Sequence, residues 1–106
     1  MPARDPLSDD QIDAALVGLD GWRRQPEPQR LVWEHTFPDF QAAFAFLLRV
    51  AFVAEAMDHH PEITNVYGDV RLALSTHDAG DRVTETDLEL ARRVAALSPS
   101  PAGRAA

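Results

Sequence analysis

The stretch AEAMDHHPEITNVYGDVRLALSTHD, residues 54–78, decides the fold. It begins inside an apolar helical pattern and reaches a corner at His59-His60-Pro61, where the helix should end because the residue before a proline is disfavoured in a helix. Two apolar segments then flank Gly68-Asp69, a two-residue connection that suits a tight hairpin. We therefore predict a helix, a corner and two antiparallel strands, over residues 63–67 and 70–76, within one continuous segment.

Upstream of this stretch the pattern predicts a helix followed by another hairpin. Ser8 and Gln11 form a capping box that begins the helix. Apolar residues then recur at helical spacing for about three turns, and Gly21 supplies a left-handed stop. Prolines follow, and beyond them apolar residues recur at alternate positions, which is the period of a strand. The expected strands of this hairpin cover residues 22–25 and 30–37.

Residues 40–57 form a long apolar segment, and Asp39 can cap its start. Because the run is apolar nearly all round, we expect a central helix covered by the sheet and by a partner subunit. Its length raises the question of a membrane span, but Gln41, Arg49 and Glu55 are each unfavourable at bilayer depth. We therefore predict a buried helix and no membrane segment.

A last helix should begin at Thr84, because Asp87 three positions later completes a second capping box. The resulting order, helix-strand-strand-helix-strand-strand-helix, predicts an α+β fold. We expect a four-stranded antiparallel sheet with three helices packed on one face. We assign residues 1–97 to a single domain and residues 98–106, rich in Pro, Ala and Ser, to a flexible C-terminal tail.

Charge and composition disfavour several functions. The chain of 106 residues has 10 basic and 17 acidic side chains and a net charge of −7, which opposes direct binding to nucleic acid or to an anionic membrane. The sequence contains no cysteine, so disulfides, thiolate metal ligands and cysteine nucleophiles are excluded. Residues 1–7 lack a basic region followed by an apolar run, so we expect no secretory signal and a cytoplasmic protein.

Three of the four histidines, His59, His60 and His77, stand at the ends of predicted elements near acidic residues. Imidazole titrates near neutral pH, so one ring can donate a proton while another accepts one, as the removal of a hydroxyl group requires. Two other interpretations stay open. The adjacent pair suits the negative end of the helix dipole, and the three rings could ligate zinc, although a fourth ligand is missing.

The remaining aromatic and imidazole side chains are expected to be structural. His35 lies on an alternating face with Trp33 and Phe37, and we predict a hydrogen-bonded structural histidine without a role in function. Trp22, Trp33 and the phenylalanines are predicted to be core residues rather than a platform for a ligand.

The region around the corner resembles a known family. Residues 55–61, followed by Tyr67, His77 and Asp87, are similar in spacing throughout to the signature of the pterin-4a-carbinolamine dehydratases. Three residues separate Glu55 from His59, five separate Pro61 from Tyr67, nine separate Tyr67 from His77, and nine separate His77 from Asp87. The likeness extends from about residue 7 to residue 97.

This resemblance implies a hydro-lyase that uses histidine general acid–base catalysis, with no metal and no organic cofactor. The substrate would be 4a-hydroxytetrahydrobiopterin or a related 4a-hydroxytetrahydropterin, and the product the quinonoid dihydropterin, as part of tetrahydrobiopterin recycling. The family further implies a homodimer or homotetramer, and a functional link to a pterin-dependent aromatic amino acid hydroxylase.

The resemblance also implies roles for particular residues. The expected catalytic residues are His59, His60, His77, Glu55 and Asp87, of which the two carboxylates orient imidazoles. The expected pterin-binding residues are Asp58, His59, His60, Pro61, Ser75, Thr76, His77 and Asp78. The capping box alone explains Asp87 equally well. At Ile63 some relatives carry an aromatic residue, so ring stacking at that position is in question.

Two alternatives share the same resemblance. The chain could be a non-catalytic dimerisation or interaction module of this fold, or a dehydratase acting in molybdopterin-related metabolism. The residues named above do not distinguish substituents on the pterin, nor do they show which histidine is the acid and which the base.

Overall fold

The computed structural model describes residues 5–97, and its order of elements confirms the predicted α+β fold. The elements are α1 (Asp9–Leu16), β1 (Trp22–Pro26), β2 (Gln29–Thr36), α2 (Phe40–Met57), β3 (Glu62–Val66), β4 (Asp69–Leu74), the short 3-10 helix η2 (His77–Ala79) and α3 (Glu85–Ala96). The predicted C-terminal tail, residues 98–106, lies outside the described residues.

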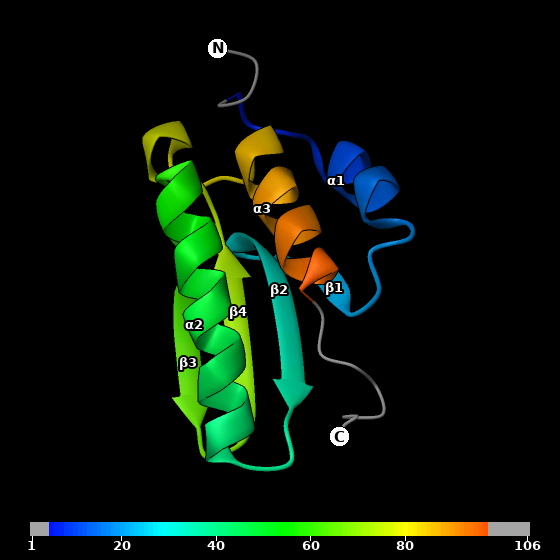
Figure 1. Ribbon diagram of the computed structural model, residues 1–106. Helices are drawn as coiled ribbons and strands as arrows, with labels where there is room; N and C mark the ends of the chain where they lie inside the picture. Colours follow the sequence, from blue (N-terminus) through cyan, green and yellow to red (C-terminus); the bar gives the residue numbers. More distant parts are fainter. Residues whose placement is uncertain (1–4, 98–106) are drawn as a thin grey trace.

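The four strands form one antiparallel sheet in the order β1-β2-β4-β3, and the three helices lie on one side of it (Figure 1). Trp33 of β2 pairs with Trp22 of β1 on one side and with Leu72 of β4 on the other. These residues belong to a buried apolar cluster between the sheet and the helices. Because side chains alternate along a strand, their sequence neighbours point to the open face of the sheet. On that face Arg71 donates a hydrogen bond to the side chain of Gln25 and forms an ion pair with Glu34.

Helix α1 begins as predicted and ends earlier than predicted. The capping box of Ser8 and Gln11 is present in both directions. The helix stops at Leu16 rather than near Gly21, because the chain leaves the helical conformation at Val17 and turns left-handed at Gly18, with φ of 89°. Leu19 therefore packs against the core from a loop.

The connection between β3 and β4 differs by one residue from the prediction. The turn residues are Tyr67 and Gly68, since Val66 pairs with Asp69. The amide of Phe37 donates a hydrogen bond to the carbonyl of Gly68 over 2.8 Å. A side chain at residue 68 would collide with the Phe37 carbonyl oxygen, so glycine is required there by close approach of two backbones.

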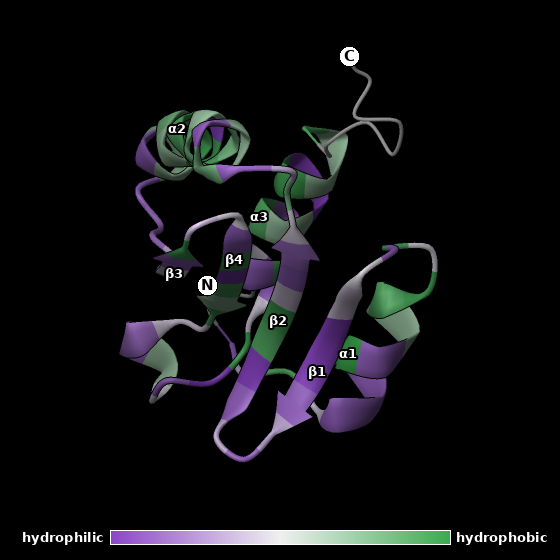
Figure 2. Ribbon diagram, turned by 90° about the horizontal axis from the view of Figure 1, so that it is seen from below, coloured by the Kyte–Doolittle hydropathy of each residue, from purple (hydrophilic) through white to green (hydrophobic). Residues whose placement is uncertain are grey.

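Helix α2 is capped at its start by Asp39, which accepts a hydrogen bond from the Ala42 amide. Its inner face packs against α3, β3 and β4, and its buried residues are Ala43, Phe46, Leu47, Val50 and Ala54. The outer face is also apolar, and Figure 2 shows hydrophobic colour around much of the helix. Phe40, Phe44 and Phe52 are exposed, so the prediction that all phenylalanines are core is wrong for these three.

By length and composition alone α2 could cross a membrane. Core helices of soluble proteins share this length and composition, and α2 contributes four buried side chains to the core between sheet and helices. We therefore interpret α2 as a helix of a globular domain with one face buried and one face exposed.

Candidate functional site

A pocket of about 310 Å³ lies where the end of α2 meets the end of β4. Its lining residues are Asp58, His59, His60, Ser75, His77 and Asp78. The three histidines singled out in the sequence thus share one pocket, although His77 is separated from the other two by a complete hairpin.

The corner after α2 buries one of two adjacent histidines and leaves the other exposed. Asp58 ends the helix in the left-handed conformation, with φ of 52° and ψ of 43°, and its amide donates to the carbonyls of Ala54 and Glu55. Thus Asp58, and not only the proline predicted to end the helix, turns the chain. The side chain of His59 is 7% exposed, whereas that of His60 is 58% exposed.

The buried ring of His59 is held by Asp87. Its Nε2 lies 2.6 Å from Oδ1 of Asp87, a carboxylate with no exposed surface. The other carboxylate oxygen, Oδ2, accepts hydrogen bonds from the Thr76 hydroxyl over 2.8 Å and from the Thr84 amide over 2.9 Å. Asp87 therefore caps α3 and also contacts His59, so the predicted cap and the predicted contact with an imidazole are compatible.

This pairing determines which nitrogen of His59 is free. An ionised carboxylate only accepts hydrogen bonds, so Nε2 of His59 must carry the hydrogen that it donates to Asp87. In the neutral ring Nδ1 then keeps its lone pair and is available to a ligand in the pocket. Asp87, being fully buried, can act on a substrate only through His59.

The other two histidines also have carboxylate neighbours. Nε2 of His60 lies 3.1 Å from Oε1 of Glu55, as the predicted orienting role requires, with both side chains exposed. Nδ1 of His77 lies 3.1 Å from Oδ1 of Asp81. Sequence reasoning missed Asp81, although its position four residues after His77 and directly after Gly80 was a signal that a turn could bring it back to the ring.

Two predicted pterin-binding residues are placed away from the wall of the pocket. Thr76 has no exposed surface, and its hydroxyl contacts the Asp87 carboxylate and the Thr84 hydroxyl in the hydrogen-bond network behind His59. Pro61 is not among the lining residues, and it leads the chain from the corner into β3. Asp58, His59, His60, Ser75, His77 and Asp78 do line the pocket.

The fourth histidine is held by aromatic rings. His35 stacks on Trp33 with ring centres 5.5 Å apart and meets Phe37 edge-on at 4.5 Å. Within residues 5–97 its ring makes no hydrogen bond, so the predicted hydrogen-bonded role is corrected to one of aromatic packing. Across the same described range no group of three or more His, Asp or Glu side chains is arranged to hold a metal ion.

Fold and site together define a class: a small α+β domain in which imidazoles paired with carboxylates line one pocket. The family model described as "Pterin 4 alpha carbinolamine dehydratase" matches residues 5–97. The chain belongs to this family.

Relatives of known sequence agree with this assignment. A protein of Nitrobacter hamburgensis, named "Putative pterin-4-alpha-carbinolamine dehydratase", is 47% identical over 92 residues, which cover 87% of this chain and 90% of the relative. A protein of the same name from Bradyrhizobium sp. (strain ORS 278) is 44% identical over 97 residues, covering 92% and 96%.

Two solved structures share the fold. A transcriptional coactivator/pterin dehydratase from Brucella melitensis superposes with a TM-score of 0.81 at 36% identity, covering 88% of this chain and 98% of that one. A pterin dehydratase-like protein, identified as a RuBisCO assembly factor in the alpha-carboxysome, has a TM-score of 0.62 at 30% identity, covering 76% and 92%. The fold therefore occurs in proteins described by different functions.

Proposed function

We propose that this protein removes water from a 4a-hydroxytetrahydropterin, such as 4a-hydroxytetrahydrobiopterin, to give the quinonoid dihydropterin. The observation that carries this proposal is the meeting of His59, His60 and His77 in one pocket, each with a carboxylate beside it. A pterin-dependent aromatic amino acid hydroxylase would supply the substrate, and the reaction would return it toward tetrahydrobiopterin.

The proposed reaction needs one proton donor and one proton acceptor. A protonated imidazole gives its proton to the hydroxyl group, which leaves as water with the electron pair of the carbon–oxygen bond. A neutral imidazole takes a proton from a ring N–H of the substrate, and the electron pair of that bond forms the new carbon–nitrogen double bond. The neutral ring of His59, with Nδ1 free, suits the acceptor, and the exposed rings of His60 and His77 suit the donor.

The carboxylates of the pocket favour a pterin without a phosphate group. Asp58 and Asp78 are on its wall, and no Arg is among the six lining residues. Carboxylates can accept hydrogen bonds from the amino and ring N–H groups of a pterin, but they repel a phosphate. This supports the biopterin-like substrate over a phosphorylated molybdopterin-related one.

Dehydration of chemically generated 4a-hydroxytetrahydropterin, followed by absorbance, tests the proposal. We expect the protein to accelerate the reaction well above the spontaneous rate, and EDTA to leave the rate unchanged because imidazoles alone move the protons. A rate equal to that without protein would contradict the dehydratase proposal. A rate abolished by EDTA and restored by zinc would contradict the metal-free mechanism.

We also propose that the exposed face of α2 pairs with a second copy of the chain. Phe40, Phe44, Leu48 and Phe52 are exposed and four residues apart, so they form one stripe along the helix. In an antiparallel pair related by a two-fold axis at residue 46, Phe40 faces Phe52 of the second copy and Phe44 faces Leu48. The stripe is thus self-complementary, as a symmetric homodimer requires. A membrane surface fits less well, because Arg49 is the only basic residue of α2.

Charge placed on this stripe should dissociate the assembly. We expect wild-type protein to show about two or four times the monomer mass of 11.7 kDa by light scattering after size exclusion. Phe52→Glu, at a side chain 77% exposed, should reduce this mass by half or more. Val17→Glu is the matched control, because Val17 is 82% exposed directly after α1, on a separate segment, and its substitution should not disturb the assembly. Monomeric wild-type protein at micromolar concentration would refute the pairing.

The same surface gives the non-catalytic alternative a specific form. An interaction module would bind a different protein through the α2 stripe and would not need the histidines. In cells without a pterin hydroxylase, a stable partner lost in Phe52→Glu but retained in His77→Ala, with no dehydratase activity in the purified protein, would favour the module over the enzyme.

A further inference from the structure

The loop that follows β4 presents His77 to the pocket in an unusual backbone conformation. Gly80 and Asp81 are both left-handed, with φ of 71° and 60°. The amide of Gly80 donates to the carbonyl of His77, and the amide of Asp81 donates to the carbonyl of Thr76, each over 3.1 Å. The Thr76 amide closes the loop by donating to the Arg82 carbonyl over 2.8 Å. These bonds bring residue 81 back beside residue 77.

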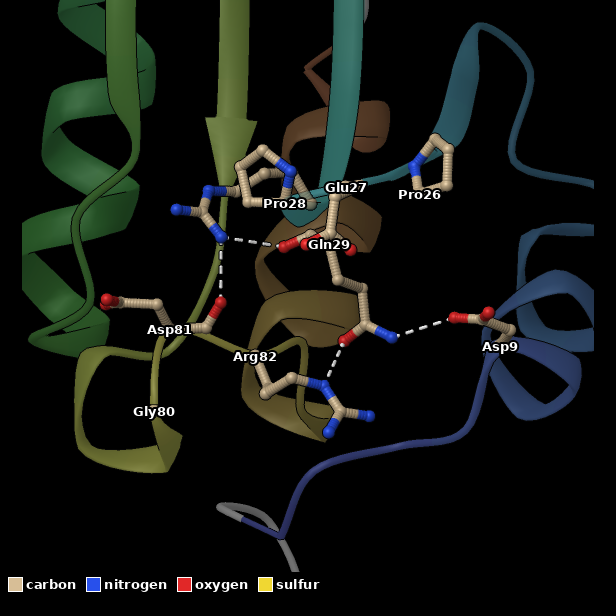
Figure 3. A pocket seen from close by; sticks show the side chains of 9 residues that line it. Asp9, Pro26, Glu27, Pro28, Gln29, Gly80, Asp81 and Arg82 are labelled. Atoms are coloured by element: carbon tan, nitrogen blue, oxygen red, sulfur yellow. Dashed lines mark hydrogen bonds between the residues drawn. The ribbon is translucent and has the colours of Figure 1, made fainter.

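A second set of contacts fixes the loop from the β1–β2 hairpin, around a cavity of about 470 Å³ (Figure 3). Arg30 of β2 donates to the carbonyl of Asp81 over 2.7 Å. The side chain of Gln29 accepts from Nε of Arg82 over 3.0 Å and from the Val83 amide over 2.9 Å. Gln29 and Arg30 of β2 therefore hold the loop at the Asp81 carbonyl and at the two residues that follow it.

An aspartate at residue 81 is unfavourable for the backbone alone. The left-handed region is disfavoured for residues with a β-carbon, and glycine would adopt it without strain. Asp and Asn tolerate it better than other side chains. The compensating interaction in this structure is the contact of Oδ1 of Asp81 with Nδ1 of His77 over 3.1 Å.

We infer that Asp81 is a positioning residue that orients His77 and fixes its tautomer. The Asp81 carboxylate accepts the hydrogen of Nδ1, so in the neutral ring Nε2 of His77 carries the lone pair toward the pocket. The side chain of His77 is 92% exposed, and within residues 5–97 the Asp81 carboxylate is the only group that forms a hydrogen bond or ion pair with its ring. Without this contact the ring would rotate freely and lose part of its catalytic alignment. The inference rests on the proposed dehydration for its effect on rate.

Two substitutions that suit the left-handed backbone separate positioning from folding. Asp81→Gly removes the side chain and relieves strain, and Asp81→Asn keeps an oxygen that can accept from Nδ1. We expect Asp81→Gly to lower kcat about two- to fivefold, the range that corresponds to an exposed pair, with KM little changed. Asp81→Asn should retain most of the wild-type kcat. Asp20→Asn, an exposed aspartate in the α1–β1 loop, makes the same change in net charge and should have no effect.

Nitrogen NMR of the His77 ring gives a readout that does not depend on activity. In wild-type protein above neutral pH, the hydrogen should reside on Nδ1, and in Asp81→Gly the signal should move toward the Nε2–H form that free imidazole side chains prefer. If Asp81→Gly leaves both the tautomer and kcat at wild-type values, or if kcat falls with the tautomer unchanged, the positioning role is wrong. If the wild-type protein shows no dehydration, the proposed function fails, and the NMR comparison still decides whether Asp81 sets the tautomer.

Discussion

Replacing His60 or His77 with alanine is expected to lower the rate of dehydration by about a hundredfold or more, with the chain remaining folded. A positioned acid or base typically contributes two to four orders of magnitude to a rate. Both side chains are largely exposed, so their removal leaves no cavity and no buried polar group unpaired. The rate is measured by the absorbance assay at saturating substrate, and folding by circular dichroism and thermal unfolding.

Arg92→Ala provides the control for these variants. Arg92 is partly exposed on α3, pairs with Glu85 and Glu89, and is not among the lining residues of the pocket. Its loss should leave the rate within a factor of two or so of wild type, because surface ion pairs contribute little to stability. Full activity in both histidine variants would show that the pocket does not perform the elimination.

Replacing Asp87 with alanine is expected to destabilise the whole domain. The substitution leaves the His59 ring, the Thr76 hydroxyl and the Thr84 amide without their shared acceptor in a fully buried place. Each buried polar group left unpaired costs about 1–3 kcal/mol, so the free energy of unfolding should fall by roughly 3 kcal/mol or more. For a domain of this size the melting temperature should fall by at least about 12 °C.

Asp87→Asn separates the two roles of this carboxylate. The asparagine oxygen can still accept from Thr84 and Thr76, so stability should be largely kept. The asparagine NH2 group would donate to Nε2 of His59, so the hydrogen of the neutral ring would move to Nδ1. This reversed tautomer should lower the rate by about a hundredfold or more. Glu89→Gln, on the same helix with a side chain 42% exposed, is the matched control and should preserve both stability and rate. An Asp87→Asn enzyme with wild-type activity would exclude a role for the His59 tautomer.

Much of the fold could be predicted because its signals are local. The two capping boxes, at Ser8 and Thr84, depend on residues three positions apart, and both are present. The hairpin turn was placed one residue late because the decisive contact of Gly68 is with Phe37, which is distant in sequence. The extent of α1 was overestimated for a related reason: apolar spacing continues to Leu19, but the backbone leaves the helix at Val17.

The candidate site was predictable in its residue types and less so in its geometry. The spacing from Glu55 to Asp87 identified the histidines and two of their carboxylates. The spacing could not show that Thr76 is buried behind His59. The alternation of side chains along a strand does not indicate that the Thr76 hydroxyl donates to Asp87. Nor did it identify Asp81, whose approach to His77 depends on left-handed backbone at two successive residues and on support from Arg30.

The double use of Asp87 links the preparation of the pocket to the docking of α3. Asp87 lies in the first turn of α3, the last helix within residues 5–97, and the bond that orients His59 forms only when that helix has docked on the sheet. During synthesis, N-terminal segments leave the ribosome first. A nascent chain that has not yet reached residue 84 already contains His59 and His60. It lacks both Thr84, which caps α3, and the Asp87 carboxylate that orients His59. Competence to bind and react should thus arise in a single late step, together with closure of the core.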